Sequence, residues 1–212
     1  MKRNLKIPLL AVMAVGALSA IGAAGAQATE FDCDTANCTI GSEKDGTGTT
    51  AHHVIDVPGN GPATCNEGQF IATGQPFEST TMTVSAAYSG CTWLGQPASI
   101  TMNSCRYTFT AHGAVSITGC AGTKIEIEIS GCVATIGDQS LSGITDSGEP
   151  GLTVTISLKV EKMHMVVEGP TCITQGTFTT GVYTTGNAIL RGYDPANPSV
   201  QVNVDWDTAT SD

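Results

Sequence analysis

The chain has 212 residues, eight cysteines and a formal net charge of −10, with 13% charged and 5% aromatic residues. Its hydrophobic content of 41% is enough to bury a core, which excludes an intrinsically disordered chain. The acidic balance argues against a nucleic-acid partner, because binding to phosphates requires a basic protein face.

Residues 1–28 have the pattern of a secretory signal peptide. Three basic residues lie in the first six positions, residues 7–21 are apolar, and Ala26-Gln27-Ala28 supplies the small residues that a signal peptidase accepts. The alternative is an uncleaved membrane anchor, but the apolar run is rich in Ala and Gly and has no basic flank after it. We therefore expect an exported protein, secreted or held at the cell envelope, with no transmembrane segment after cleavage.

The rest of the chain divides into a polar start and a region of regular alternation. Residues 29–50 are rich in turn-forming residues, and we expect an irregular N-terminal arm there. Over residues 51–212 apolar side chains alternate with Thr, Ser and Glu, and no segment keeps a 3.6-residue period over three turns. This pattern predicts a single all-β domain, an antiparallel sandwich or barrel.

Between residues 80 and 130 the alternation predicts a meander of adjacent hairpins. Turns at 103–104, 111–113 and 121–123 place the apolar residues on one face, as a consistent register demands. The predicted opposite pairs are Met102–Cys105, Ile100–Tyr107, Phe109–Val115, Tyr107–Ile117, Ile117–Ile127 and Val115–Ile129.

The eight cysteines predict a disulfide framework, because an even number of cysteines in an exported chain is typical of disulfide bonding. The meander places one pair at one end of the sheet, within reach of a bridge, and a second pair at the opposite end if the sheet closes. The remaining two pairs follow by elimination, and no spacing matches a zinc site. The predicted pairs are Cys105–Cys120, Cys91–Cys132, Cys33–Cys38 and Cys65–Cys172.

The tripeptide Ser/Thr-Gly-Cys occurs three times, at residues 89–91, 118–120 and 130–132. Glycine frees the backbone to turn and cysteine can pin the end of a strand, so we interpret the tripeptide as a strand-end device. It is too short to establish an internal repeat.

Several segments around the cysteines carry a resemblance to a known family. They are Phe31-Asp-Cys33…Cys38-Thr39, Thr64-Cys65, Tyr88-Ser-Gly-Cys91-Thr-Trp-Leu-Gly95, and residues 100–109, 115–125 and 131–139. With them the chain resembles a family of small exported proteins of unknown function, found in many paralogous copies in certain actinobacteria. The resemblance covers most of residues 29–180. It implies export and a disulfide framework, and it brings no activity and no catalytic residue.

His52, His53 and Asp56 form the one histidine cluster in the sequence. On a strand, neighbouring residues point to opposite faces, so the two histidines cannot bind one ion together. We expect a solvated strand or turn at this position. His112 and His164 are expected to be exposed or half-buried.

Motifs for catalysis, cofactors and metals are missing from the sequence. No G-x-S-x-G or H-E-x-x-H segment occurs, and the acidic residues are scattered. Calcium is the least implausible ion, because Asp205 with Asp207, and Asp138 with Asp146 and Glu149, supply hard oxygen ligands. Neither group has the spacing of a calcium loop, and we expect no cofactor and no resident metal.

Export, the cysteines and the lack of a catalytic motif favour a non-catalytic extracellular or envelope-associated structural or binding module with an unknown partner. The alternative is a secreted hydrolase whose carboxylates are assembled by the fold. Two carboxylates about 5–10 Å apart in a pocket would favour that alternative.

Overall fold

The computed structural model describes residues 31–43, 53–110, 114–146 and 154–206. These residues form β-strands and the turns between them, and they contain no helix. The predicted signal peptide, His52 and His112 lie outside the described residues. The all-β prediction is confirmed.

The strands follow one another along the chain with short connections. They are β1 (Phe31–Glu43), β2 (His53–Val57), β3 (Gly61–Ser79), β4 (Thr81–Trp93), β5 (Gln96–Thr101), β6 (Arg106–Thr110), β7 (Ala114–Thr118), β8 (Ile125–Ile129), β9 (Cys132–Ile136), β10 (Gln139–Asp146), β11 (Val154–Glu168), β12 (Gly176–Asp194), β13 (Asn197–Val202) and β14 (Val204–Trp206).

The sheet closes into an antiparallel eight-strand barrel with extra strands. Four strands, β3, β4, β11 and β12, each pair with two further strands in succession, so that they take part in two closed rings. We call the ring completed by β2, β5, β8 and β9 the hairpin ring. The ring completed by β1, β6, β7 and β10 is the terminal ring. The described barrel is therefore two rings of eight strands that share four strands.

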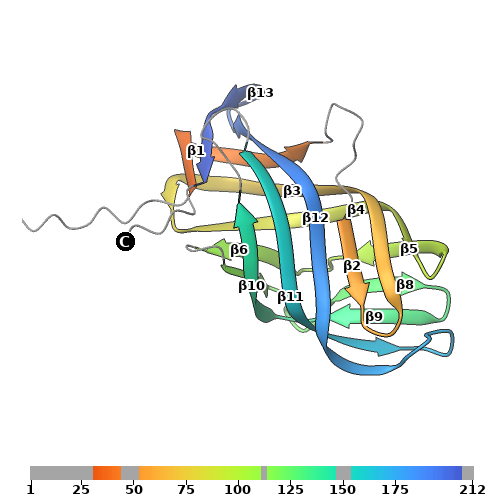
Figure 1. Ribbon diagram of the computed structural model, residues 1–212. Coiled ribbons are helices and arrows are strands. Elements are labelled where there is room, and N and C mark those ends of the chain that lie inside the picture. Colours follow the sequence, from red (N-terminus) through yellow and green to blue (C-terminus); the bar gives the residue numbers. More distant parts are fainter. Residues whose placement is uncertain (1–30, 44–52, 111–113, 147–153, 207–212) are drawn as a thin grey trace, which may run out of the picture.

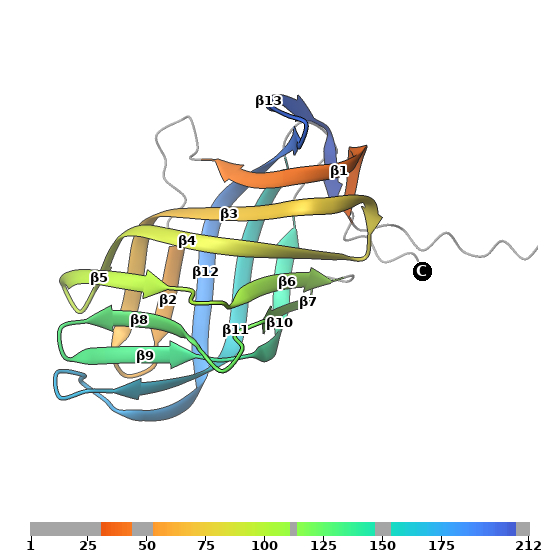
Figure 2. The same cartoon turned by 180° about the vertical axis from the view of Figure 1, so that it is seen from behind.

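The long strands bend as they pass from one ring to the other. In Figure 2, β3, β4, β8 and β9 cross in front of β11 and β12, which run upright, and Figure 1 shows β3 turning from one direction to the other. Such corners are typical of orthogonal packing, in which strands switch sheets by bending. The interior between the crossed layers holds the core.

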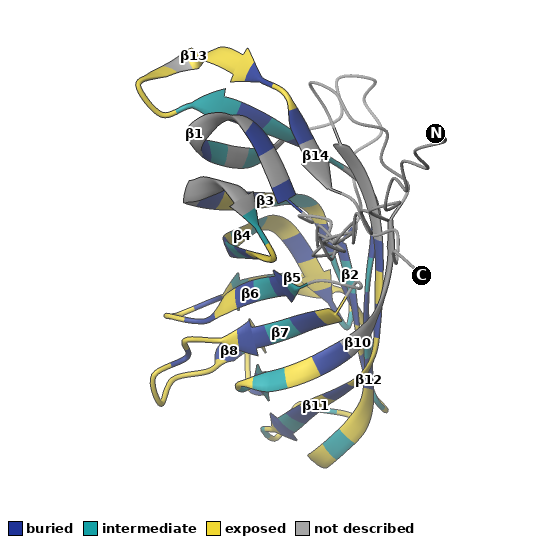
Figure 3. Cartoon of the chain, turned by 90° about the vertical axis from the view of Figure 1, so that its left-hand side faces the viewer, coloured by how far each residue is buried: buried dark blue, intermediate teal, exposed yellow. Residues whose placement is uncertain are grey.

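Alternation along each strand puts apolar side chains in this interior. On β8, Ile125, Ile127 and Ile129 are buried, whereas Glu126 is half-buried and Glu128 exposed on the outer face. Buried and exposed residues alternate in the same way along the strands in Figure 3.

The expectation of an irregular arm over 29–50 is wrong for the part that the structure describes. Residues Phe31–Glu43 form β1, which pairs with β3, β12 and β14. Phe31, Cys33 and Cys38 point into the core. The polar composition misled the prediction because this strand is stabilised by the neighbours that it pairs with rather than by its own β-propensity.

The predicted meander is correct at one of its three turns. β6 and β7 pair with Phe109 opposite Val115 and Tyr107 opposite Ile117; the turn residues 111–113 themselves lie outside the described residues. The chain does not reverse at 103–104 or 121–123. β5 and β6 both pair with β4, and Ile127 lies opposite Ile100 instead of Ile117.

At residues 103–104 and 121–123 the regular strand is interrupted without a reversal of the chain, and we call these positions the two breaks. They leave the buried face unchanged. Met102, Cys105 and Tyr107 are all buried, as predicted, although they lie along one line of the barrel instead of across a hairpin. Asn103 and Ala121 take positive φ angles of 51° and 50° within the breaks. The alternation thus indicated which side chains face inward but not which strands are neighbours.

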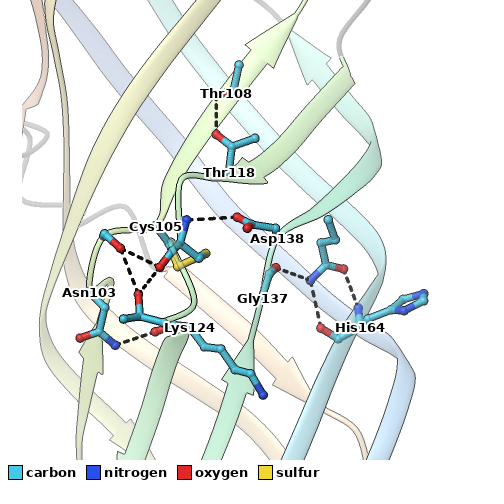
Figure 4. Close-up of a disulfide and its surroundings, with 12 residues drawn as sticks. Asn103, Cys105, Thr108, Thr118, Lys124, Gly137, Asp138 and His164 are labelled. Atoms are coloured by element: carbon cyan, nitrogen blue, oxygen red, sulfur yellow. Dashed lines mark hydrogen bonds between the residues drawn. A yellow bond between two sulfur atoms is a disulfide. The ribbon is translucent and has the colours of Figure 1, made fainter.

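A disulfide and side-chain hydrogen bonds join the two breaks (Figure 4). The Cys105–Cys120 bridge links them with Cα atoms 4.0 Å apart. Ser104 Oγ donates to the Cys120 carbonyl at 2.8 Å, and the Cys120 amide donates to Asp138 Oδ1 at 3.1 Å. Asn103 Nδ2 donates to the Lys124 carbonyl at 2.6 Å.

All eight cysteines are paired, and two of the four predicted pairs are correct. The bridges are Cys33–Cys38, Cys105–Cys120, Cys65–Cys91 and Cys132–Cys172. The predicted pairs Cys91–Cys132 and Cys65–Cys172 are wrong.

The reason for these two errors is the position of β3. The prediction did not place β3 beside β4, yet Cys65 lies directly opposite Cys91 in their register, with Cα atoms 3.9 Å apart. Cys132 begins β9, which pairs with the end of β11, and the following loop brings Cys172 within 5.0 Å. The cysteine pairs assigned by elimination were therefore wrong because the prediction lacked the pairing of β3 with β4.

The glycines of the Ser/Thr-Gly-Cys tripeptides, Gly90, Gly119 and Gly131, all have positive φ angles. Gly131 lies in the turn between β8 and β9 and Gly119 follows β7, as expected for a strand-end device. Gly90 lies inside β4, and the inward-facing positions on that strand change there from even to odd numbers. At this position the tripeptide shifts the register of side chains within a strand.

Candidate functional site

Five aromatic residues meet inside the barrel at the level where the two rings join. This waist cluster consists of His53 on β2, Phe70 on β3, Tyr88 on β4, Tyr107 on β6 and Tyr183 on β12. It contains three of the four tyrosines in the chain. Four of its five residues carry a polar group into the interior of the barrel.

A row of hydrogen bonds connects the polar groups of the waist cluster. The hydroxyl groups of Tyr107 and Tyr88 are 3.1 Å apart, and Tyr88 donates to Tyr183 Oη over 3.5 Å. Tyr183 Oη lies 2.8 Å from His53 Nδ1. Because Tyr88 uses its one proton toward Tyr183, Tyr107 donates to Tyr88. The direction of the hydrogen bond between Tyr183 and Nδ1 of His53 depends on the tautomer of the imidazole.

Ring packing fixes the orientation of these groups. The His53 and Tyr183 rings are stacked with centroids 6.2 Å apart, and Tyr107 is nearly parallel to Tyr183 at 6.3 Å. Tyr88 meets both His53 and Phe70 edge to face. Such arrangements are favourable for aromatic quadrupoles.

Gly68 on β3 makes room for the imidazole. A Cβ atom at this position would lie 2.2 Å from His53 Nε2, far inside a normal contact. The backbone of β3 therefore approaches the histidine ring as closely as it does only because residue 68 has no side chain.

The surroundings keep all three phenols of the waist cluster neutral. Burial raises the pKa of Tyr88, Tyr107 and Tyr183 well above the ordinary value for tyrosine, and repulsion from a neighbouring phenolate raises each pKa further. His53, Tyr107 and Tyr183 are buried, whereas Tyr88 is half-buried. Besides His53, the buried polar residues in the described part of the chain are Asn60 and Thr185, whose side chains do not ionise.

The prediction of a solvated strand or turn at His53 is wrong, because His53 is 1% exposed. The position of His53 in β2 could have indicated its burial. His53, Ile55 and Val57 share one period-2 face, and all three are buried. Asp56 on the opposite face is exposed. His164 is exposed, as predicted.

The cluster as a whole was not predicted from the sequence. Tyr107 was assigned to an inward face, but the alternation contains no information about which hydroxyl groups meet. The contact with Tyr183 depends on the closure of the barrel between distant segments. A histidine in register with buried aliphatic residues was the one local indication.

The acidic residues considered for calcium do not form a metal site in the part of the chain that the structure describes. No three His, Cys, Asp or Glu side chains gather there as a metal ion would require. Asp138 accepts the hydrogen bond from the Cys120 amide. Glu149 and Asp207 lie outside the described residues.

No family model, curated protein or solved structure matches the chain. Within the described residues, no helix has the length and apolar character needed to cross a membrane. Four disulfides are typical of proteins that fold in an oxidising, extracellular environment.

Proposed function

We propose that the protein is exported and acts outside the cytoplasm, free or at the cell envelope, as a non-catalytic structural or binding module. The observation that carries the proposal is the pairing of all eight cysteines, because such bridges form and persist in oxidising compartments. The signal-peptide pattern of residues 1–28 supports the same compartment.

The position of the bridges suits a module that has to stay folded outside the cell. Cys65–Cys91 and Cys132–Cys172 fasten the hairpin ring, and Cys105–Cys120 fastens the breaks between the rings. Each bridge stabilises the fold by roughly 2–4 kcal/mol by restricting the unfolded chain. The four bridges therefore help the folded protein to persist outside the cell.

The outer face over β4, β6 and β7 presents uncharged hydroxyl groups. Thr83 and Thr118 both hydrogen-bond to Thr108, each at 3.0 Å between Oγ1 atoms. Since the chain as a whole is acidic, a partner that docks on the barrel is expected to be neutral or basic and not an anion.

Expression of the full chain in a secreting host tests the export proposal. We expect the protein outside the cytoplasm, beginning at Thr29 and without free thiols, as shown by mass spectrometry before and after thiol labelling. An Ala28→Asp variant is the control, because a charged residue at the cleavage position should leave residues 1–28 attached. A full-length cytoplasmic chain with reduced cysteines would contradict the proposal.

A secreted hydrolase remains the alternative proposal, and its carboxylate pair would have to come from outside the buried residues described above. An assay of the purified oxidised protein on ester, peptide and glycoside substrates tests it. Turnover that disappears after reduction of the disulfides would favour the hydrolase over the non-catalytic module.

A further inference from the structure

The hairpin ring ends in four turns that lie at one end of the barrel, and we call this end the turn end. The strand register places the turns together, because the pairings of β2 with β3, β3 with β4, β5 with β8, β9 with β11 and β11 with β12 all reach this end. Figure 1 shows the turns on the right. They are residues 57–61, 93–96, 129–132 and 168–176. The most exposed large apolar side chain of the described residues, Ile173 at 71%, lies here.

The segment that carries Ile173 is fixed in place by neighbouring turns. Cys172 is bridged to Cys132. The amides of Ile173 and Thr174 both donate to Oδ1 of the buried Asn60, at 2.8 and 3.1 Å. A side chain on a backbone that is already ordered costs little conformational entropy when it binds a partner. Ile173 is therefore an exposed apolar contact that the fold holds ready.

The charges around Ile173 are all negative. The turns of this end, together with three residues on either side of each, contain four acidic residues and no lysine or arginine; the acidic residues are Asp56, Glu126, Glu128 and Glu168. Asp56, Glu128 and Glu168 are exposed, and Glu126 is half-buried. The lysines and arginines that the structure describes lie elsewhere in the barrel, at Arg106, Lys124, Lys159, Lys162 and Arg191.

An apolar side chain among carboxylates is complementary to a surface that carries apolar side chains among lysines and arginines. We propose that the turn end binds a basic amphipathic segment of another protein, with Ile173 against its apolar side chains and the carboxylates beside its basic ones. This inference rests on the binding role proposed above and names the class of partner. Its test uses the purified protein, so its failure is distinguishable from a failure of the export proposal.

The same charges disfavour two other occupants of the turn end. A second copy of the chain would bring an equally acidic end against the first, and like charges repel. A bilayer with anionic lipids has a negative surface potential and repels the carboxylates as well. A basic segment, by contrast, is attracted by these charges, and its association weakens as salt screens them.

Binding of a synthetic leucine–lysine peptide with the spacing of an amphipathic helix tests the proposal. We expect the purified oxidised chain to bind one peptide per chain, as measured by fluorescence anisotropy of the labelled peptide, with an affinity that falls as the salt concentration rises. A peptide with glutamate in place of each lysine is the charge control and should not bind. Absence of binding by the leucine–lysine peptide, or equal binding of both peptides, would overturn the proposal.

A substitution of Ile173 locates the contact. Ile173→Ser should weaken peptide binding at least about ten-fold, because the variant lacks the apolar anchor. Val200→Ser is the matched control: Val200 is 45% exposed on β13, outside the turn end, and its variant should bind like the unmodified chain. Circular dichroism checks that both variants are folded. Equal affinities of the two variants would contradict the proposal.

Two glutamates on β11 separate a local attraction from the net charge of the chain. Glu168 and Glu161 are both exposed, but only Glu168 lies at the turn end. Glu168→Gln should weaken peptide binding by roughly two- to five-fold and reduce its salt dependence, whereas Glu161→Gln should leave both unchanged. Equal losses in the two variants would show that the peptide responds to net charge alone, which is not what a docking site at the turn end predicts.

Gel filtration, and sedimentation with vesicles of phosphatidylglycerol and phosphatidylcholine, test the other two occupants. We expect that neither self-association nor vesicle binding depends on Ile173. A dimer or a vesicle-bound form that Ile173→Ser abolishes would assign Ile173 to that occupant and overturn the proposal.

Discussion

Asn60 and His53 are both 1% exposed and lie only seven positions apart, yet their hydrogen bonds differ in kind. Asn60 Nδ2 donates to the carbonyls of Pro58 and Thr174, and its Oδ1 accepts from the amides of Ile173 and Thr174. His53 is bonded through Nδ1 to the phenol of Tyr183. A buried polar group bonded only to backbone holds a loop in place. One bonded to another side chain, as His53 is, instead joins two strands through their side chains.

The surroundings of the two residues follow this division. The loop that Asn60 holds is also fixed by the Cys132–Cys172 bridge and by Thr171, whose amide and hydroxyl donate to the carbonyls of Gly131 and Ser130. It presents Ile173, which is 71% exposed, on a rigid support. At the waist, by contrast, the row of hydrogen bonds joins side chains of four different strands to one another.

Removal of the bridge beside Asn60 should have the largest effect. Cys132 and Cys172 are 40 residues apart, so the double variant Cys132→Ser/Cys172→Ser should lose about 4 kcal/mol of unfolding free energy. The matched control, Cys33→Ser/Cys38→Ser, opens a much shorter loop and should lose about 2 kcal/mol. Urea denaturation measures both, and equal losses would contradict the role assigned to the loop.

Alkaline pH should lower the unfolding free energy through the tyrosines of the waist cluster and not through the hydrogen bonds of Asn60. The folded pKa values of Tyr88, Tyr107 and Tyr183 are raised, so the unfolded chain loses phenolic protons that the folded chain keeps. Stability is therefore complete below the unfolded pKa of about 10 and falls as the pH rises above it, by up to about 4 kcal/mol for three tyrosines at pH 11.

Urea denaturation as a function of pH measures this loss. Tyr183→Phe should reduce the slope above pH 10 by up to about 1.4 kcal/mol per pH unit. If Tyr193→Phe reduces the slope by the same amount, the waist is not the cause.

Asn60→Ala should destabilise the protein by about 3 kcal/mol, because it removes four hydrogen bonds and leaves buried backbone groups without partners. Asn103→Ala is the control: Asn103 is exposed and donates to the Lys124 carbonyl, and the loss of this exposed hydrogen bond should cost less than about 1 kcal/mol. Faster hydrogen exchange at the amides of Ile173 and Thr174 would show that the loss is local to the loop. Unchanged hydrogen exchange at both amides would contradict the conclusion that Asn60 holds this loop in place.

Gly68→Ala should cost about 2 kcal/mol by overpacking the waist against His53. In a His53→Ala background the same substitution should be nearly neutral, and a double-mutant cycle measured by chemical denaturation gives the coupling. Gly137→Ala is the control, because nothing lies within 4 Å of a Cβ built there and its φ angle is ordinary. Additive costs would show that residue 68 does not act through the imidazole.

The sequence allowed prediction of which side chains face the core, and strand partners only in part. Met102, Tyr107 and Ile127 were assigned correctly, because period-2 alternation is a local property. The alternation is the same whether the chain reverses at 103–104 or continues in the same direction. For this reason the continuation from β5 to β6 was interpreted as a hairpin. The Cys65–Cys91 bridge and the waist cluster depend on pairings between segments far apart in sequence, which local periodicity does not contain.

The sharing of β3, β4, β11 and β12 by both rings has a consequence for how the molecule comes apart. Opening either ring withdraws the same four strands from the other, so neither half can survive as a separate folding unit. The strands that are not shared divide the described barrel into the hairpin ring and the terminal ring. A chain that contained only one set of these strands could not close its ring, so we expect the barrel to fold as one cooperative unit.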